Sequence, residues 1–156
     1  MDFEPSARAT EYRDRLLDFV TTVVDPKTPE YFAQVDASGD PHFSPPVMDE
    51  LKAEARARGL WNLFLSDAEE GAGLTNLEYA PLCEIMGRSP LTAEATNCAA
   101  PDTGNMEILH MFGTPLQQEQ FLRPLLDGEI RSCFAMTEPW VASSDATNIS
   151  SSITRD

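Results

Sequence analysis

The sequence predicts a mainly α protein that ends in the beginning of a β-domain. Two observations point to this class. Apolar residues recur with helical spacing through most of the chain, between typical helix start and stop signals. After Gly128 the period changes to the alternation of a strand. We therefore expect a helical domain over residues 1–128 and the first one or two strands of a truncated β-domain over residues 129–156.

Five helices are expected in the helical domain. The first covers about residues 7–24 and stops before Pro26, and residues 25–44 are then expected to form an irregular connection rich in proline and aspartate. Ser44 is the expected N-cap of the second helix, because its hydroxyl can accept from early N–H groups and the prolines after it are tolerated in a first turn. Gly59 closes this helix.

The other three helices also carry end signals. A T-x-x-E capping box that starts at Thr75 opens the third helix, and Thr114 opens the fifth in the same way with glutamine. Asp102 is expected to cap the fourth helix. Residues 91–100, which are mostly small, fit either a helix or a loop. Glycines close the three helices: Gly87, Gly113 and Gly128.

The strand prediction rests on alternation between two sets of side chains from Ile130 to Thr137. Pro139 ends this strand, because proline has no N–H to give to a neighbouring strand. Residues 149–154 form a second strand candidate.

The charge balance excludes some classes of partner. The chain has 11 basic and 26 acidic side chains, a formal net charge of −15. An acidic surface of this size repels phosphate backbones and anionic lipids, so we expect no nucleic-acid partner. No apolar run approaches the roughly 18–20 residues of a membrane span, so no membrane insertion is expected.

The cysteines and histidines predict neither a disulfide framework nor a metal site. Cys83, Cys98 and Cys133 are odd in number and widely spaced, as is typical of reduced thiols. The acidic start of the chain does not resemble a signal peptide, so we expect a cytoplasmic protein. His42 and His110 lie far apart, outside any metal-ligand spacing.

One motif is more specific than all these features. The run F-x-M-T-E-P from Phe134 to Pro139 is followed by V-A-S-S-D-A-T-N over residues 141–148. Helices that lead into a strand with this ending resemble the N-terminal helical domain and first middle-domain strand of the acyl-CoA dehydrogenases, in the branch with T-E-P-x-V-A-S-S-D-A-T-N. Four further segments resemble the family in its own order: residues 71–76, 84–87, 97–106 and 124–131.

The resemblance implies an oxidoreductase of fatty acid metabolism, a flavoprotein that uses FAD to remove hydrogens from the α and β carbons of an acyl-CoA. It implies that Phe134 and Met136 contact the isoalloxazine ring through backbone and apolar atoms. It implies that Thr137 gives its hydroxyl to the polar edge of the ring. Ser144 is implied near both the cofactor and the thioester end of the substrate.

The resemblance names no catalytic residue in this chain. In the family, the carboxylate that removes the α-proton lies in a C-terminal helical bundle, which has no counterpart in these residues. We therefore expect the chain alone to be inactive and to bind FAD weakly or not at all. Where many members have glycine, this chain has Trp140, which either covers the flavin or is exposed.

Two other interpretations stay open at this stage. One is that the chain is a non-catalytic interaction module or subunit that pairs its β tail with a partner chain or with a second copy of itself. Unpaired strand edges favour such association. A weaker interpretation is an unrelated helical interaction domain whose motif matches by chance.

Overall fold

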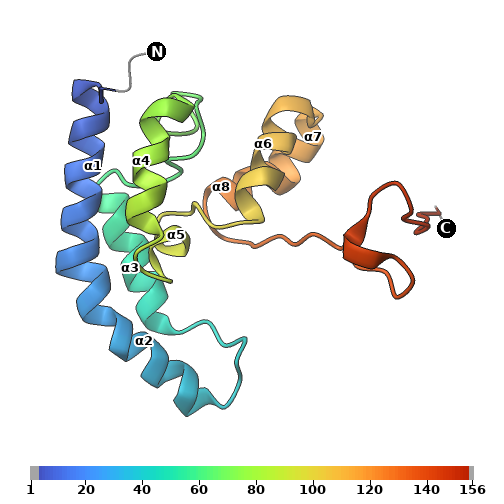
Figure 1. Ribbon diagram of the computed structural model, residues 1–156, viewed down its shortest axis with the longest axis horizontal. Helices are drawn as coiled ribbons and strands as arrows, with labels where there is room; N and C mark the ends of the chain where they lie inside the picture. The colour runs from blue at the N-terminus through green and yellow to red at the C-terminus, as the bar shows by residue number, and fades with distance from the viewer. Residues whose placement is uncertain (1–3, 155–156) are drawn as a thin grey trace.

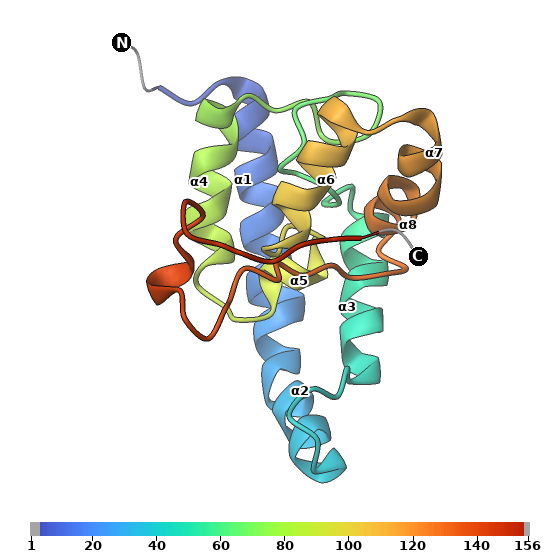
Figure 2. The same ribbon diagram turned by 90° about the vertical axis from the view of Figure 1, so that its right-hand side faces the viewer.

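The computed structural model describes residues 4–154 of the 156-residue chain. Helices make up its body, and the C-terminal segment leaves this body and runs away from it, as Figure 1 shows in red. Figure 2 views the molecule from the side on which that segment leaves. None of the described helices is both long and apolar enough to cross a membrane.

The N-terminal part is one continuous helical rod that bends where α1 passes into α2 (Figure 1). It consists of α1 (Ala7–Phe19), the π-helical turn η1 (Val20–Val24) and α2 (Asp25–Ser38). Ser6 caps the rod, because its hydroxyl oxygen accepts from the N–H of Ala9 at 3.0 Å.

The prediction of an irregular connection from residue 25 was wrong up to residue 38, which is helical. Pro26 falls in the first turn of α2, where a missing N–H costs little, and the wider π-helical turn immediately precedes it. Pro29 lies inside the helix. Nearby, the Thr28 hydroxyl donates to the carbonyl of Val24 at 2.9 Å, which supports the backbone of this turn.

Helix α3 (Pro46–Ala57) begins one residue later than Ser44 predicted. Its N-cap is Pro45, which has no side-chain acceptor, so the Ser44 prediction was wrong. Gly59 closes the helix as predicted: its φ is +66°, and the following N–H of Leu60 donates back to the Ala55 carbonyl at 2.8 Å.

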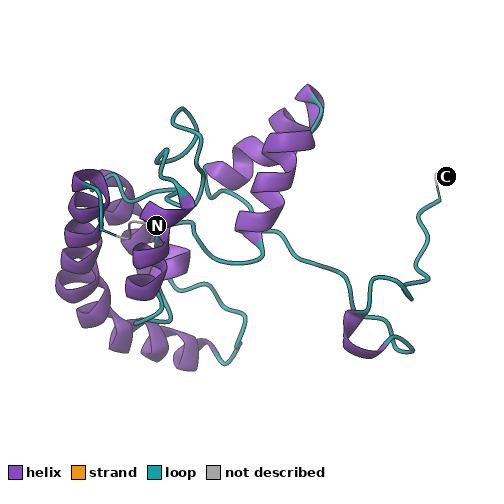
Figure 3. Ribbon diagram, turned by 45° about the horizontal axis from the view of Figure 1, so that its top comes forward, coloured by secondary structure: helices purple, strands orange, loops and turns teal. Residues whose placement is uncertain are grey.

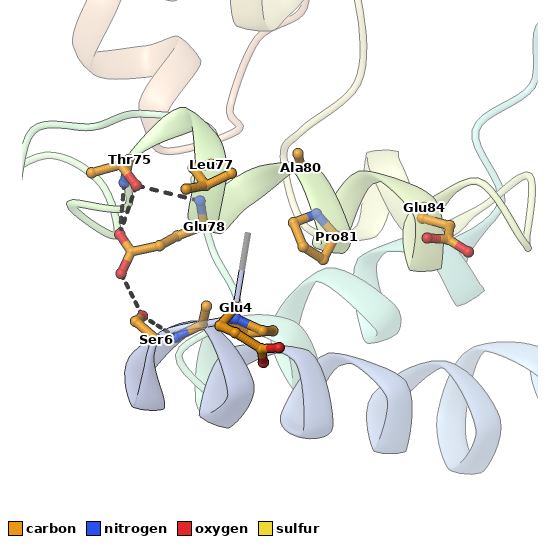
Figure 4. A pocket seen from close by; sticks show the side chains of 10 residues that line it. Glu4, Ser6, Thr75, Leu77, Glu78, Ala80, Pro81 and Glu84 are labelled. Carbon is orange, nitrogen blue, oxygen red and sulfur yellow. Dashed lines mark hydrogen bonds between the residues drawn. The ribbon is translucent and has the colours of Figure 1, made fainter. Parts of the chain in front are cut away.

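Helix α4 (Asn76–Met86) has the predicted capping box. The Glu78 N–H donates to the Thr75 hydroxyl, and the Glu78 carboxylate accepts from the Thr75 N–H at 3.0 Å. The same carboxylate accepts from the Ser6 hydroxyl at 2.6 Å, which joins the starts of α1 and α4 (Figure 4). Residues 91–100 contain a single helical turn, α5 (Thr92–Ala95), with loops around it.

The last helices form a pair beside this body (Figure 1). Helix α6 (Asp102–Phe112) is followed by a helical stretch that begins with the predicted Thr114 capping box. Asp102 is not the N-cap of α6 but its first residue, so that prediction was wrong. The stretch consists of α7 (Pro115–Gln117), η2 (Gln118–Leu122) and α8 (Arg123–Leu126).

The core joins α1, α3, α4, α6 and the last helical stretch, whereas α2 contributes no buried residue. Each fully buried large side chain contributes about 1.5–3 kcal/mol relative to an exposed one. The fully buried members include Leu16 and Phe19 of α1, Met48 and Leu51 of α3, Leu82 of α4, Met106 of α6 and Leu122 of η2.

The two predicted strands are not formed in the described residues (Figure 3). Residues 131–138 form no regular element: Figure 1 draws them as a stretched-out segment without a neighbouring strand with which to exchange hydrogen bonds, and pairing defines a strand. Residues 149–154 are also irregular, and the only regular element after α8 in this part is the short turn η3 (Ala142–Ser144).

Candidate functional site

The predicted contact residues lie on an extended, accessible segment. Phe134 is 56% exposed and Met136 is 41% exposed. Within residues 4–154, the backbone N–H groups from Cys133 to Thr137 donate no hydrogen bond. The Thr137 side chain is exposed as well. This stretch therefore offers apolar side chains together with backbone donors that are free for a ligand or a neighbouring strand.

The ring of Phe134 leans toward helix α6. Its Cζ lies 3.7 Å from the position that a Cβ would occupy on Gly104. The exposed face of Phe134 and the small residue beneath it place the segment beside the first turns of α6. Next to it, a cavity of about 370 Å³ is lined by Ile108, Phe121, Leu125 and Ile130, among others.

Ser144 lies in a loop that Glu138 closes. The Glu138 carboxylate accepts from the N–H groups of Ser150 at 3.0 Å and of Ser151 at 2.7 Å. The bonds from the Ser151 hydroxyl and the Ser150 N–H lower the pKa of Glu138 to about 2. The loop from 138 to 151 is thus held shut by one carboxylate.

Inside this loop the backbone is unusual. Ser143 and Ser144 have φ values of +55° and +53°, a left-handed conformation that non-glycine residues adopt at a cost of about 1–2 kcal/mol each. Asp145 supports the turn by accepting from the Thr147 N–H at 2.9 Å. Trp140 is 96% exposed.

The sequence analysis missed the anchor of this segment. The Asp102 carboxylate, at the start of α6, accepts from the N–H of Ser132 at 2.7 Å and from its hydroxyl at 2.6 Å. Its other oxygen accepts from Nε of Arg131. No local pattern could reveal this pairing, because the partners lie about thirty positions apart and the acid occupies a position typical of a helix start.

The anchor extends to two more helices. Arg131 also pairs with Glu94 of α5 at 2.8 Å, and Glu94 pairs with Lys52 of α3 at 3.1 Å. From α6, the Asn105 amide donates to the Ser132 hydroxyl at 2.8 Å. The two residues before Cys133 are therefore attached directly to α5 and α6, and through Glu94 to α3.

The segment fits one part of an FAD molecule and not the rest. Its free N–H groups and apolar side chains suit the edge and face of a flavin ring. A pyrophosphate needs cations or a cluster of backbone donors, but Arg131 is the single basic residue between positions 129 and 154, and two carboxylates already occupy it. The residues present can touch the ring and cannot by themselves hold the phosphates.

Two other features lie away from the segment. A cavity of about 590 Å³ lies between the start of α1 and α4, lined by Pro5, Ala9, Leu77, Pro81 and neighbouring residues (Figure 4). In the described part of the chain, no three potential metal ligands come together.

Comparison with known proteins gives a consistent family. The model of the acyl-CoA dehydrogenase N-terminal domain matches residues 6–129. A protein of Mycobacterium tuberculosis named probable acyl-CoA dehydrogenase FadE2 is 61% identical over 158 residues, which cover 100% of this chain and 38% of that protein. Human acyl-CoA dehydrogenase family member 11 is 50% identical over 127 residues, 81% of this chain and 16% of that protein.

A solved structure from Mycobacterium abscessus, assigned to the acyl-CoA dehydrogenases, has the same fold with a TM-score of 0.87 and 50% sequence identity. The match covers 94% of this chain and 38% of that one, so the chain spans well under half the length of these relatives. The helices, the segment after them and these matches agree: this chain belongs to the acyl-CoA dehydrogenase family and contains its N-terminal domain.

Proposed function

We propose that this chain is the N-terminal part of an FAD-dependent oxidoreductase that dehydrogenates the α and β carbons of an acyl-CoA thioester. The chain alone is inactive and holds FAD weakly or not at all. Family membership supports the reaction class. One observation supports the inactivity of the isolated chain. The segment from Cys133 to Thr137 presents a wall for a flavin ring but no cations for the phosphates.

In this proposal, four residues form that wall. Phe134 and Met136 contact the ring, Thr137 donates its hydroxyl to the polar edge, and Ser144 lies at the thioester end of the substrate. Residues 1–128 are then the helical domain and residues 129–156 the beginning of a β-domain. Bound FAD would accept the hydride, while the chain's own residues orient the ring and exclude water from one side.

The strands predicted after Gly128 belong to this proposal. The backbone from 133 to 137 has free N–H groups and needs only a neighbouring strand to become part of a sheet. We propose that the remainder of a longer protein, whose relatives extend well beyond the matched region, provides that neighbour. The free thiols of the three cysteines favour a cytoplasmic location.

A chimera tests the function. Residues 1–156 replace the matching part of FadE2, and the purified chimera is compared with the isolated chain for bound flavin and for acyl-CoA oxidation with a dye acceptor. We expect a yellow chimera and a colourless, inactive chain. Thr137→Ala in the chimera is expected to weaken flavin retention by roughly tenfold, the loss of one strong hydrogen bond.

Ser66→Ala, on an exposed loop, is the matched hydroxyl control and leaves flavin retention unchanged. An isolated chain that is yellow and oxidises acyl-CoA would refute the proposal that the chain alone is inactive. A colourless but folded chimera would refute the flavin assignment.

A second candidate function follows from the same free backbone. The chain can act as a non-catalytic subunit whose segment from Cys133 to Thr137 pairs with a strand of a partner or of a second copy. Size-exclusion chromatography with light scattering checks this: a dimer that is lost when residues 129–156 are deleted supports it. A strictly monomeric chain over the accessible concentration range rules out self-pairing.

A further inference from the structure

Asp102 is a buried acid whose side-chain hydrogen-bond partners are two consecutive residues, Arg131 and Ser132. Its residue is only 2% exposed. A buried carboxylate is costly unless its oxygens are paired and hydrogen-bonded. Both oxygens are satisfied by Arg131 and Ser132, the two residues that precede the flavin-contacting segment. Burial raises the pKa of Asp102, but the hydrogen bonds from Ser132 and Arg131 outweigh burial, and its pKa is lowered overall.

A role in holding α6 together does not account for this geometry. The N-cap of α6 is Pro101, with no side-chain cap, and the Asp102 carboxylate does not accept from the first N–H groups of its own helix. A negative charge in the first turn adds a modest stabilisation of about 0.3–1 kcal/mol whichever way it points. The oxygens point instead to a segment about thirty positions later in the sequence.

The anchor is also the last polar attachment of the segment to the helices. Within the described residues, no hydrogen bond or ion pair joins residues 133–154 to α1 through α8. From Ser132 to Thr137 the extended chain spans about 17 Å, at roughly 3.3 Å per residue. A small rotation at the start of such an arm moves its far end by several ångströms.

We propose that Asp102 is a positioning residue for the flavin site. It fixes Arg131 and Ser132, and through them the direction in which Phe134, Met136 and Thr137 leave the helical body. It does not touch the cofactor. The inference rests on the proposed function for the part that concerns FAD, and on the structure alone for the part that concerns the segment.

The first test uses the chain itself. In Asp102→Asn, one amide group replaces an oxygen and faces the Arg131 guanidinium, so two donors oppose each other. Hydrogen exchange at the Ser132 amide is expected to accelerate at least about tenfold, the effect of losing one charge-assisted hydrogen bond. Ser132→Ala keeps the backbone bond and is expected to have a smaller effect. Unchanged exchange in Asp102→Asn, with circular dichroism showing a folded chain, overturns the proposal.

The second test uses the FadE2 chimera and reads flavin affinity and the visible flavin spectrum at equal folded fraction. Asp102→Asn is expected to weaken FAD binding about tenfold and to broaden the flavin absorption bands. The double variant D102N/R131Q restores a neutral pair that can hydrogen-bond, so it is expected to regain part of the affinity. A merely structural acid would not give this rescue.

Asp67→Asn is the matched control, because the Asp67 carboxylate also accepts from two backbone N–H groups, of Glu69 and Glu70, but has no contact with the segment. It is expected to leave flavin binding unchanged. Flavin binding equal to wild type in Asp102→Asn overturns the positioning role while the proposed function stands. A wild-type chimera without flavin contradicts the proposed function, and the exchange test on the chain still decides whether Asp102 orients the segment.

Discussion

The side-chain amide of Asn97 donates to the Oδ1 of Asn62 at 2.7 Å, in the interior of the protein. Both residues have left-handed backbones, with φ of +56° and +53°. Asn97 also donates to the carbonyls of Leu125 at 3.0 Å and Leu126 at 3.3 Å, which are the last residues of α8. This pair fixes the end of α8, and therefore the point from which the C-terminal segment departs.

Loss of the Asn97 amide is expected to destabilise the fold. Asn97→Ala leaves the buried side-chain oxygen of Asn62 without its donor and places alanine in a left-handed conformation, for a total of about 3 kcal/mol in the free energy of unfolding. Asn97→Gly removes the same bonds without the backbone strain and is expected to cost about 1 kcal/mol less. Urea unfolding measures both. Equal costs for the two variants would contradict the contribution of strain.

Replacing Gly128 by alanine is expected to destabilise the fold more than the same replacement at Gly39, which also has a left-handed backbone. Its φ is +67°, and a Cβ there would lie 2.8 Å from Cζ2 of Trp61. Gly39, with φ of +68°, has open space around it. We expect Gly39→Ala to cost about 1 kcal/mol from backbone strain and Gly128→Ala about 2–3 kcal/mol, since the Trp61 ring must also move.

Thermal and urea unfolding of the two alanine variants provide the comparison. Because both variants share the backbone strain, the difference between their costs measures the contacts of the new methyl group with Trp61 and with the Arg56 guanidinium that stacks on its ring. If Gly39→Ala proves as costly as Gly128→Ala, this contact does not limit the site.

Replacing Gly104 by alanine is expected to stabilise the fold. It lies inside α6 with ordinary helical geometry, and an added Cβ would make a normal contact with Phe134 at 3.7 Å. Gly104→Ala is therefore expected to raise the free energy of unfolding by about 0.5–1 kcal/mol. The same change in a Phe134→Ala background separates helix propensity from the ring contact. A loss of stability that disappears in that background would show that the ring has no room for the methyl.

The closed loop from Glu138 to Ser151 should open in acid. The folded-state pKa of Glu138 is lowered to about 2 from 4.5. A depressed pKa gives stability that is complete above the unfolded value and is lost as pH falls through the folded one. We expect the loop to stay closed at pH 5, to weaken below about pH 4.5 and to open near pH 2.

The amide resonances of Ser150 and Ser151, followed by NMR from pH 6 to pH 2, measure this opening. Glu138→Gln keeps one acceptor oxygen but has no proton to gain, so its amide shifts are expected to lose this pH dependence. A wild-type transition centred at pH 4.5 would mean that the serines do not stabilise the carboxylate.

The sequence by itself determined the features that depend on neighbours along the chain. The capping boxes at Thr75 and Thr114 and the glycine stops at Gly59 and Gly128 formed as predicted, because the groups that satisfy a helix end lie within a few residues of it. The family that the F-x-M-T-E-P run predicted is confirmed by the family match over residues 6–129, which precede the run. The prolines after the first helix gave a wrong prediction: the helix continued through residues 25–38, where a π-helical turn precedes Pro26.

Only the tertiary structure decided what the C-terminal segment is attached to. Asp102 looked like a cap and instead binds Arg131 and Ser132. The strand predicted after Gly128 is unpaired in the structure. Alternating side chains give a segment the two faces of a strand, but its hydrogen bonds must come from a neighbouring strand. Where a segment points depends on contacts between residues far apart in sequence, and no local pattern encodes them.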